Sequence, residues 1–165
     1  MNRIVGIGFT YLLLAFSFTS YAYNLKQLAN KEYMSNTSIT SLCQDDRGVM
    51  WIGTCDGLNL YDGKQIQSPQ AEGISEYLSG NLIDKIIYTE ENTYWIQTYY
   101  SLNKLNNETG VITPYSQFNK LFFMDKDKDN ILFVINKSNS IQYYHKESES
   151  FRELNLSGIP YSDIL

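Results

Sequence analysis

The sequence predicts an all-β chain of short antiparallel strands, and three observations lead to this fold class. Short runs of β-branched, aromatic and aliphatic residues alternate with polar turn signals along most of the 165 residues. Hydrophobic residues make up 43% of the chain and aromatic residues 15%, so a buried core can form. The same order of strands and turns also recurs along the chain, which is typical of repeat architectures.

The segment from Asp45 to Gly63 shows the pattern most clearly, because three turn signals lie within it. These signals are Asp46-Arg47-Gly48, Asp56-Gly57 and Asp62-Gly63. Asp and Gly tolerate the backbone angles that tight reversals require. The intervening runs Val49–Thr54 and Leu58–Tyr61 favour strands. The segment is therefore predicted to form a compact antiparallel meander.

Three copies of this unit begin at Ser38, Leu82 and Lys120. The aromatic anchors of the copies are Trp51, Trp95 and Phe133, which lie 44 and 38 residues apart. The aliphatic residues that follow them after seven, seven and eight positions are Leu58, Leu102 and Ile141. The second copy keeps Thr98 in the place of Thr54, whereas the third copy is degenerate.

Four short strands in about 40 residues, with one aromatic anchor, are typical of a β-propeller blade. We expect three blades of four antiparallel strands, at about residues 37–68, 81–116 and 120–156. The expected strands are Ile39–Cys43, Val49–Thr54, Leu58–Tyr61, Gln65–Gln67, Ile83–Tyr88, Thr93–Thr98, Leu102–Leu105, Val111–Tyr115, Leu121–Met124, Ile131–Ile135, Ile141–Tyr144 and Phe151–Leu154. An all-β sandwich of twelve short strands is the alternative. Because propellers close with about four to eight blades, we expect residues 23–165 to be a partial propeller, truncated at its C-terminus.

The N-terminus, residues 1–22, has the pattern of a signal peptide. Arg3 precedes the apolar run Ile4–Phe18, and Ser20-Tyr21-Ala22 offers small residues for cleavage. The apolar run is shorter than the roughly 20 residues that a membrane span requires. An uncleaved anchor helix is the alternative. The sequence therefore predicts export, with a periplasmic location for the mature chain.

The charge and the cysteines exclude two kinds of site. A net charge of −5 argues against a nucleic-acid surface, which needs a basic patch. Cys43 and Cys55 are predicted to lie on the order of 15 Å apart along paired strands, beyond the ~7 Å that a disulfide spans. We expect two free or core-packed thiols. With His145 as the single histidine, the cysteines make no convincing zinc site, and no cofactor is expected.

The first copy closely resembles the two-component regulator propeller repeat. The matching positions are Asp45, Gly48, Met50, Trp51, Ile52, Gly53, Thr54, Gly57, Leu58, Tyr61 and Asp62. The second copy keeps Trp95, Ile96, Thr98 and Leu102 but lacks the Asp-Gly positions. The segment that follows the predicted signal peptide also resembles the start of the periplasmic sensor region of Bacteroides-type hybrid two-component histidine kinases.

This resemblance implies a large dimeric sensor that recognises an oligosaccharide and switches on genes for polysaccharide utilisation. In such proteins, propellers precede an immunoglobulin-like domain, a membrane helix and a histidine kinase core. This chain carries no kinase motif, so it is not expected to be an enzyme by itself. Two alternatives stay open: part of a secreted propeller enzyme acting on carbohydrate, or a non-catalytic interaction propeller.

The candidate ligand-binding residues are Tyr99 and Tyr100, which occupy the turn where the first copy has Cys55-Asp56-Gly57. Tyrosines at a loop can stack on sugar rings and form hydrogen bonds with their hydroxyl groups. Edge packing or a dimer contact is the alternative. The acidic run Asp125–Asn130 lacks the Gly and the distal Glu of a calcium loop, so a solvated turn is expected there.

Overall fold

The computed structural model describes residues 31–67, 69, 74, 78–90 and 92–154, which fold into three four-stranded antiparallel sheets. A short 3-10 helix, η1 (Lys31–Tyr33), precedes the first sheet. The predicted signal peptide lies outside the described residues. In the described ranges, no helix has both the length and the apolar character that crossing a membrane requires.

Each sheet is a four-stranded meander of the kind that the repeat predicts. Blade 1 contains β1 (Ile39–Gln44), β2 (Met50–Thr54), β3 (Gly57–Tyr61) and β4 (Ile66–Gln67). Blade 2 contains β5 (Ile83–Tyr88), β6 (Thr93–Thr98), β7 (Leu102–Asn106) and β8 (Val111–Tyr115). Blade 3 contains β9 (Phe123–Lys126), β10 (Leu132–Ile135), β11 (Ile141–His145) and β12 (Ser150–Glu153). The predicted all-β fold class, with propeller blades of four strands, is confirmed.

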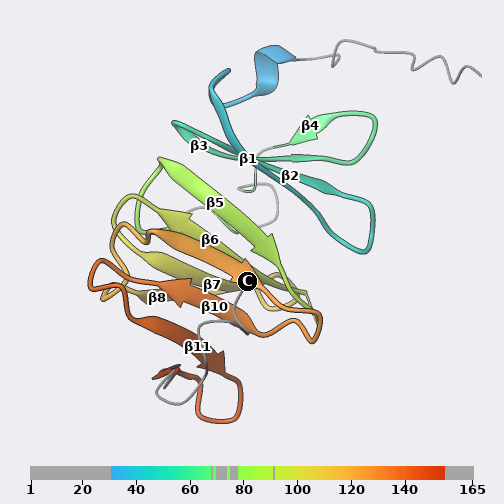
Figure 1. Ribbon diagram of the computed structural model, residues 1–165. Coiled ribbons are helices and arrows are strands. Elements are labelled where there is room, and N and C mark those ends of the chain that lie inside the picture. Colours follow the sequence, from blue (N-terminus) through green and yellow to red (C-terminus); the bar gives the residue numbers. More distant parts are fainter. Residues whose placement is uncertain (1–30, 68, 70–73, 75–77, 91, 155–165) are drawn as a thin grey trace, which may run out of the picture.

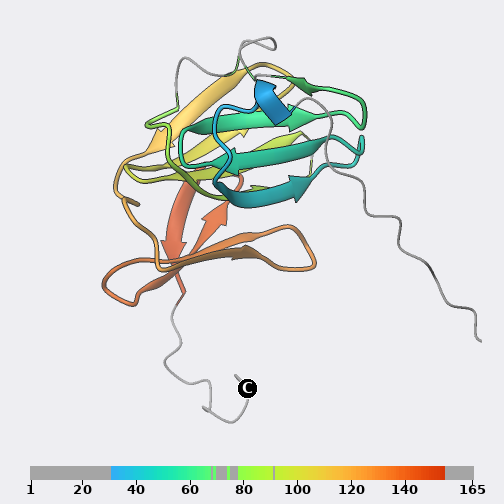
Figure 2. The same cartoon turned by 90° about the horizontal axis from the view of Figure 1, so that it is seen from above.

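The three blades follow one another in space as they do in sequence. In Figure 1 they succeed each other from blue-green blade 1 to orange blade 3, with blade 2 between them. Figure 2 shows the last strands of blade 3 running across the direction of the blade 1 strands, so the sheets fan out. The first strands of the blades, β1, β5 and β9, are neighbours along the fan.

Side chains of β1 bind the unpaired edge of β5. Ser41 Oγ accepts a hydrogen bond from the Ile86 amide at 2.9 Å, and Cys43 Sγ accepts one from the Tyr88 amide at 3.2 Å. An uncovered strand edge is an exposed template for association, so these contacts protect β5. The structure keeps Cys43 and Cys55 as free thiols, as predicted; Cys43 is half-buried and Cys55 is exposed.

The first strand of blade 3 differs from the prediction by two residues. It was expected at Leu121–Met124, but β9 runs two residues further towards the hairpin turn, and Leu132 pairs with Lys126. Five residues, 127–131, connect the two strands. The Asp127 carboxylate stabilises this turn, because it accepts hydrogen bonds from the Asp129 and Ile131 amides, both at 2.9 Å. Asn130 closes the turn with φ 61°. The acidic run is thus partly strand and partly a turn stabilised by its own carboxylate.

An apolar core fills the joint between blades 1 and 2. Its buried members are Trp51, Leu58, Leu60, Ile74, Ile83, Ile86, Tyr94, Ile96 and Leu105. Trp51 stacks on Tyr94, with ring centroids 3.8 Å apart. Gly53 permits this close approach, since a Cβ added there would lie 2.7 Å from Ile83 Cγ2. The two sheets therefore meet with an indole and a phenol ring face to face.

A buried carboxylate links the same two blades. The Asp45 side chain, which is 0% exposed, accepts hydrogen bonds from Tyr94 Oη at 2.7 Å, Arg47 Nη2 at 2.9 Å and Trp51 Nε1 at 3.2 Å. Burial by itself raises the pKa of Asp45, but these hydrogen bonds outweigh burial and leave the pKa below its ordinary value. We call Asp45, Arg47, Trp51 and Tyr94 the Asp45 network.

A second core fills the joint between blades 2 and 3 and is more aromatic. Its buried members are Ile87, Trp95, Leu102, Phe118, Met124, Leu132 and Val134. Trp95 packs edge to face against Tyr144 and Phe151, with centroids 4.6 and 5.7 Å away. Trp95 thus occupies in the second joint the position that Trp51 occupies in the first.

We predict that Tyr94→Phe lowers the free energy of unfolding by about 1.5–3 kcal/mol, the usual contribution of a hydrogen bond to a charged group. The change keeps the stacked ring and removes only the hydroxyl that bonds to Asp45. Urea denaturation of both proteins measures the difference. Tyr61→Phe is the matched control, because the Tyr61 hydroxyl bonds to the Gly63 carbonyl at an exposed turn. Equal stability of Tyr94→Phe and wild type would contradict the prediction.

We further predict that the stability difference between wild type and Asp45→Asn depends on pH. The folded pKa of Asp45 lies below its unfolded value of 3.8, so its stabilisation is complete above that value and is lost as the pH falls through the folded pKa. Denaturation of both proteins between about pH 2 and pH 7 tests this. The difference should stay constant near neutral pH and shrink in acid; a difference that grows in acid would refute it.

Candidate functional site

The candidate ligand residues lie on a tight turn between β6 and β7. The Thr98 amide donates to the Ser101 carbonyl at 2.9 Å, and Thr98 Oγ1 donates to the same carbonyl at 3.1 Å. These bonds close the turn without any contribution from the side chains between them. Tyr99 and Tyr100 are 42% and 64% exposed, and their rings are nearly perpendicular with centroids 5.1 Å apart. The structure therefore brings the two predicted tyrosines together on the surface.

Neighbouring residues hold the two rings in place. Lys120 Nζ lies 4.1 Å from the centroid of the Tyr99 ring, a cation–π contact from the segment that leads to β9. Tyr100 packs on Gly80, where an added Cβ would lie 2.8 Å from the Tyr100 ring and where φ is +154°. Gly80 is thus required both by its backbone conformation and by the ring beside it.

Two adjacent hollows adjoin the tyrosines. One, of about 580 Å³, is shallow and is lined by Gly80, Asn81, Leu82, Tyr99 and Tyr100. The other, of about 300 Å³, shares Gly80 and Asn81 and extends to Tyr33 of η1 and Asp56 of blade 1. Asn81 joins the blades here, because its carbonyl accepts the Gly57 amide at 2.7 Å and its Nδ2 donates to Asp56 at 3.3 Å. The surface therefore crosses from blade 1 to blade 2.

A repeated polar network supports this surface from below. In blade 2, Asn103 Nδ2 donates to Ser79 Oγ at 3.0 Å, and Ser79 Oγ bonds to Thr98 Oγ1 at 2.8 Å. In blade 1 the same contacts join Asn59, Ser35 and Thr54, at 2.8 and 3.0 Å. Each network ties the segment that leads into a blade to the turn between its second and third strands.

Sequence reasoning found the tyrosines but missed this support. Ser79 and Asn103 follow Ser35 and Asn59 by 44 residues, the same interval that separates the two tryptophans. That shared interval was available in the sequence. Lys120 and Gly80 left no comparable signal, because their contacts with the tyrosines join segments that do not repeat.

The remaining residues of the predicted blade motif lie in turns and in the core rather than at the hollows, apart from Gly57 and Leu58, which line the smaller one. Gly48 and Gly57 adopt φ values of 82° and 124°, and an added Cβ at Gly57 would lie 3.1 Å from Ser35 Oγ. Tyr61 bonds to its own turn, and Leu58, Trp95 and Leu102 are buried.

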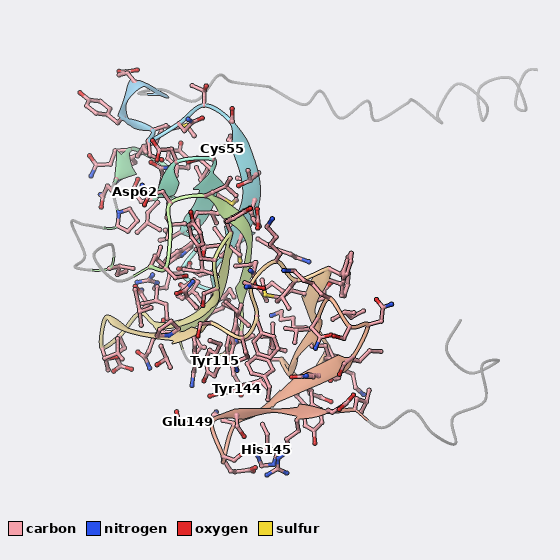
Figure 3. All side chains as sticks on the ribbon, turned by 90° about the vertical axis from the view of Figure 1, so that its left-hand side faces the viewer. Cys55, Asp62, Tyr115, Tyr144, His145 and Glu149 are labelled. Atoms are coloured by element: carbon pink, nitrogen blue, oxygen red, sulfur yellow. The ribbon has the colours of Figure 1, made fainter. Side chains whose placement is uncertain are left out.

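His145 ends β11 and lies at the hairpin that connects β11 with β12 in blade 3, as Figure 3 shows. Its Nδ1 is 2.9 Å from Ser148 Oγ, and its Nε2 is 2.9 Å from Glu147. In the part of the chain that the structure describes, no three His, Cys, Asp or Glu side chains gather as a metal site would require.

A protein family model and several solved structures are similar to this chain. Residues 33–56 match the family model described as the two component regulator propeller. The extracellular domain of the putative hybrid two component system BT3049 from B. thetaiotaomicron is similar over 84% of this chain, with 24% identity and a TM-score of 0.65. The corresponding domain of BT4673 is similar over 74%, with 20% identity and a TM-score of 0.58. Virginiamycin B lyase from Staphylococcus aureus covers 73%, with 13% identity and a TM-score of 0.52.

The chain spans 21% of the BT3049 domain, 18% of the BT4673 domain and 42% of the lyase. No curated protein matches the sequence. At these identities the solved structures show a shared fold. Residues 33–56 thus match the two component regulator propeller, and the chain shares its blade fold with the extracellular domains of these two Bacteroides two component systems.

Proposed function

We propose that this chain is part of the ligand-sensing ectodomain of a two-component system, exported to the periplasm. The regulator propeller repeat at residues 33–56 and the fold shared with two sensor ectodomains support this proposal. In it, the chain binds and does not catalyse, and a histidine kinase elsewhere in the parent protein carries the signal. Ligand binding would bias the arrangement of the ectodomains in a homodimer.

The ligand in this proposal is an oligosaccharide, and the observation that carries it is the exposed pair Tyr99 and Tyr100. Two rings set at 83° provide apolar walls of different orientation. Neighbouring segments add polar groups, since Asn81 lines the hollow beside the rings and the Lys120 ammonium group lies over the Tyr99 ring. A sugar ring has an apolar face and a rim of hydroxyl groups, so it matches both features.

The proposal also includes further blades of the parent chain as partners. Ile39 and Leu42 on β1 are 51% and 60% exposed. By strand register they correspond to Ile83 and Ile86 on β5, which are 0% and 4% exposed because blade 1 covers them. The outer face of blade 1 therefore has the apolar side chains that cover a joint elsewhere in the chain.

We predict that Tyr100→Ala weakens binding of an oligosaccharide by about two- to tenfold, since stacked aromatic contacts each contribute about 0.5–1.5 kcal/mol beyond burial. A panel of plant and microbial oligosaccharides would be screened first by calorimetry with the wild-type chain. Val111→Ala is the control, because Val111 is 58% exposed at the opposite end of blade 2.

Tyr100→Phe separates stacking from hydrogen bonding, because it keeps the ring and removes the hydroxyl group. We expect an intermediate loss of affinity. Binding that survives Tyr100→Ala and Tyr99→Ala unchanged would place the ligand elsewhere and would contradict the proposed site.

A further inference from the structure

We propose that a pocket in the joint between blades 2 and 3 binds a planar aromatic ring of the size of phenol. The pocket has a volume of about 100 Å³, and Trp95, Leu132 and Tyr144 form its apolar wall. Its polar rim includes Thr89 and Lys104. This inference does not rest on the proposed oligosaccharide site, which lies at the other end of the strands.

Corresponding residues of the two joints can be compared directly, because the strand pairing around each tryptophan is the same. Trp51 pairs with Leu60 in blade 1, and Trp95 pairs with Lys104 in blade 2. Asp45 and Thr89 occupy the same position six residues before each tryptophan. The pocket is therefore the second-joint counterpart of the space that the Asp45 network occupies in the first joint.

In the first joint a tyrosine ring fills that space, whereas the tyrosine of the second joint lies one strand further out. Tyr94 on β6 pairs with Leu105 on β7, and its ring covers the Trp51 indole. In blade 3 the leucine and the tyrosine have exchanged strands. Leu132 lies on β10, and Tyr144 lies opposite Leu132 on β11, because Phe133 pairs with Tyr143. The ring has moved outward by one strand, a distance of about 4.8 Å.

The displaced ring leaves the position over Trp95 only partly filled. Tyr144 meets the indole edge to face at 4.6 Å, whereas Tyr94 stacks on Trp51 at 3.8 Å. The Tyr144 hydroxyl accepts a hydrogen bond from Lys104 at 2.8 Å rather than turning to a carboxylate. Figure 3 shows Tyr144 and Tyr115 close together beside this joint. The cavity beside the Trp95 indole arises because blade 3 has Leu132 at the position where blade 2 has Tyr94.

The size and charge of the pocket define the class of ligand. An apolar cavity of about 150 Å³ is known to accept benzene, so an open pocket of 100 Å³ suits a single ring whose edge reaches solvent. Both rim cations are paired, Lys104 with Glu149 and Lys146 with Glu90, each at 3.5 Å. The lining itself has two cations, Lys104 and Lys146, and two anions, Glu90 and Asp129, so the charges of the site balance. The site therefore favours an uncharged ring, with a hydroxyl group directed to Thr89 as Tyr94 directs its own to Asp45.

The test is a titration of the full isotope-labelled chain with p-cresol, the side chain of tyrosine as a free molecule. We expect the indole N–H signal of Trp95 to shift saturably, while that of Trp51 stays unchanged because Tyr94 already covers it. Nuclear Overhauser contacts from p-cresol to Leu132 methyl groups would locate the ring in the wild-type protein without any variant.

Two substitutions test this difference between the joints, because one fills the pocket of the second joint and the other opens a pocket in the first. Leu132→Tyr refills the pocket and should weaken p-cresol binding at least about tenfold, whereas the matched Leu132→Met should retain it. Tyr94→Leu should open the first joint and make the Trp51 signal respond. No saturable shift in the wild type, contacts to other residues, or unchanged binding in a folded Leu132→Tyr variant would each overturn the proposal.

Discussion

The burial of one tryptophan per joint is the interaction on which the rest of this structure depends. Trp51 and Trp95 are 0% and 2% exposed, and each is the largest buried side chain of the core in its joint. A single four-stranded blade has an apolar face that it cannot bury alone. The position of the indole therefore fixes how far apart successive blades lie and how the loops at their ends meet.

The tryptophan side chains of the two joints have different kinds of neighbours. In the first joint, the buried Asp45 carboxylate accepts hydrogen bonds from the indole N–H and from the hydroxyl group of the stacked tyrosine. Separating the two blades would break the hydrogen bond from the tyrosine to this charged group. In the second joint, Trp95 contacts three aromatic rings, those of Tyr115, Tyr144 and Phe151, and contacts of this kind are less directional than hydrogen bonds. The first joint is therefore closed around its tryptophan by a stacked ring, whereas the second has a pocket beside its tryptophan.

The sequence predicted the strands well because each begins and ends at a turn with a physical signature. Turn-closing Asp side chains and left-handed Gly or Asn residues define most hairpins, and they are local features of the chain. The error at Leu121–Met124 arose because acidic residues on the exposed end of β9 were assigned to the turn. The partners of Trp51 were beyond prediction, since Tyr94 meets Asp45 from 49 residues away and nothing local marks that contact.

The same reasoning explains why a ligand surface can arise at the tyrosine turn without a change in the fold. Thr54 and Thr98 close equivalent turns with their own hydroxyl groups and a main-chain carbonyl, and Asn59 and Asn103 anchor the segments beneath them. The side chains at the tips of these turns contribute nothing to closure. A small turn in blade 1 and the Tyr99-Tyr100 turn in blade 2 are thus closed in the same way, so the side chains at the tips can differ between blades without a change in the closing hydrogen bonds.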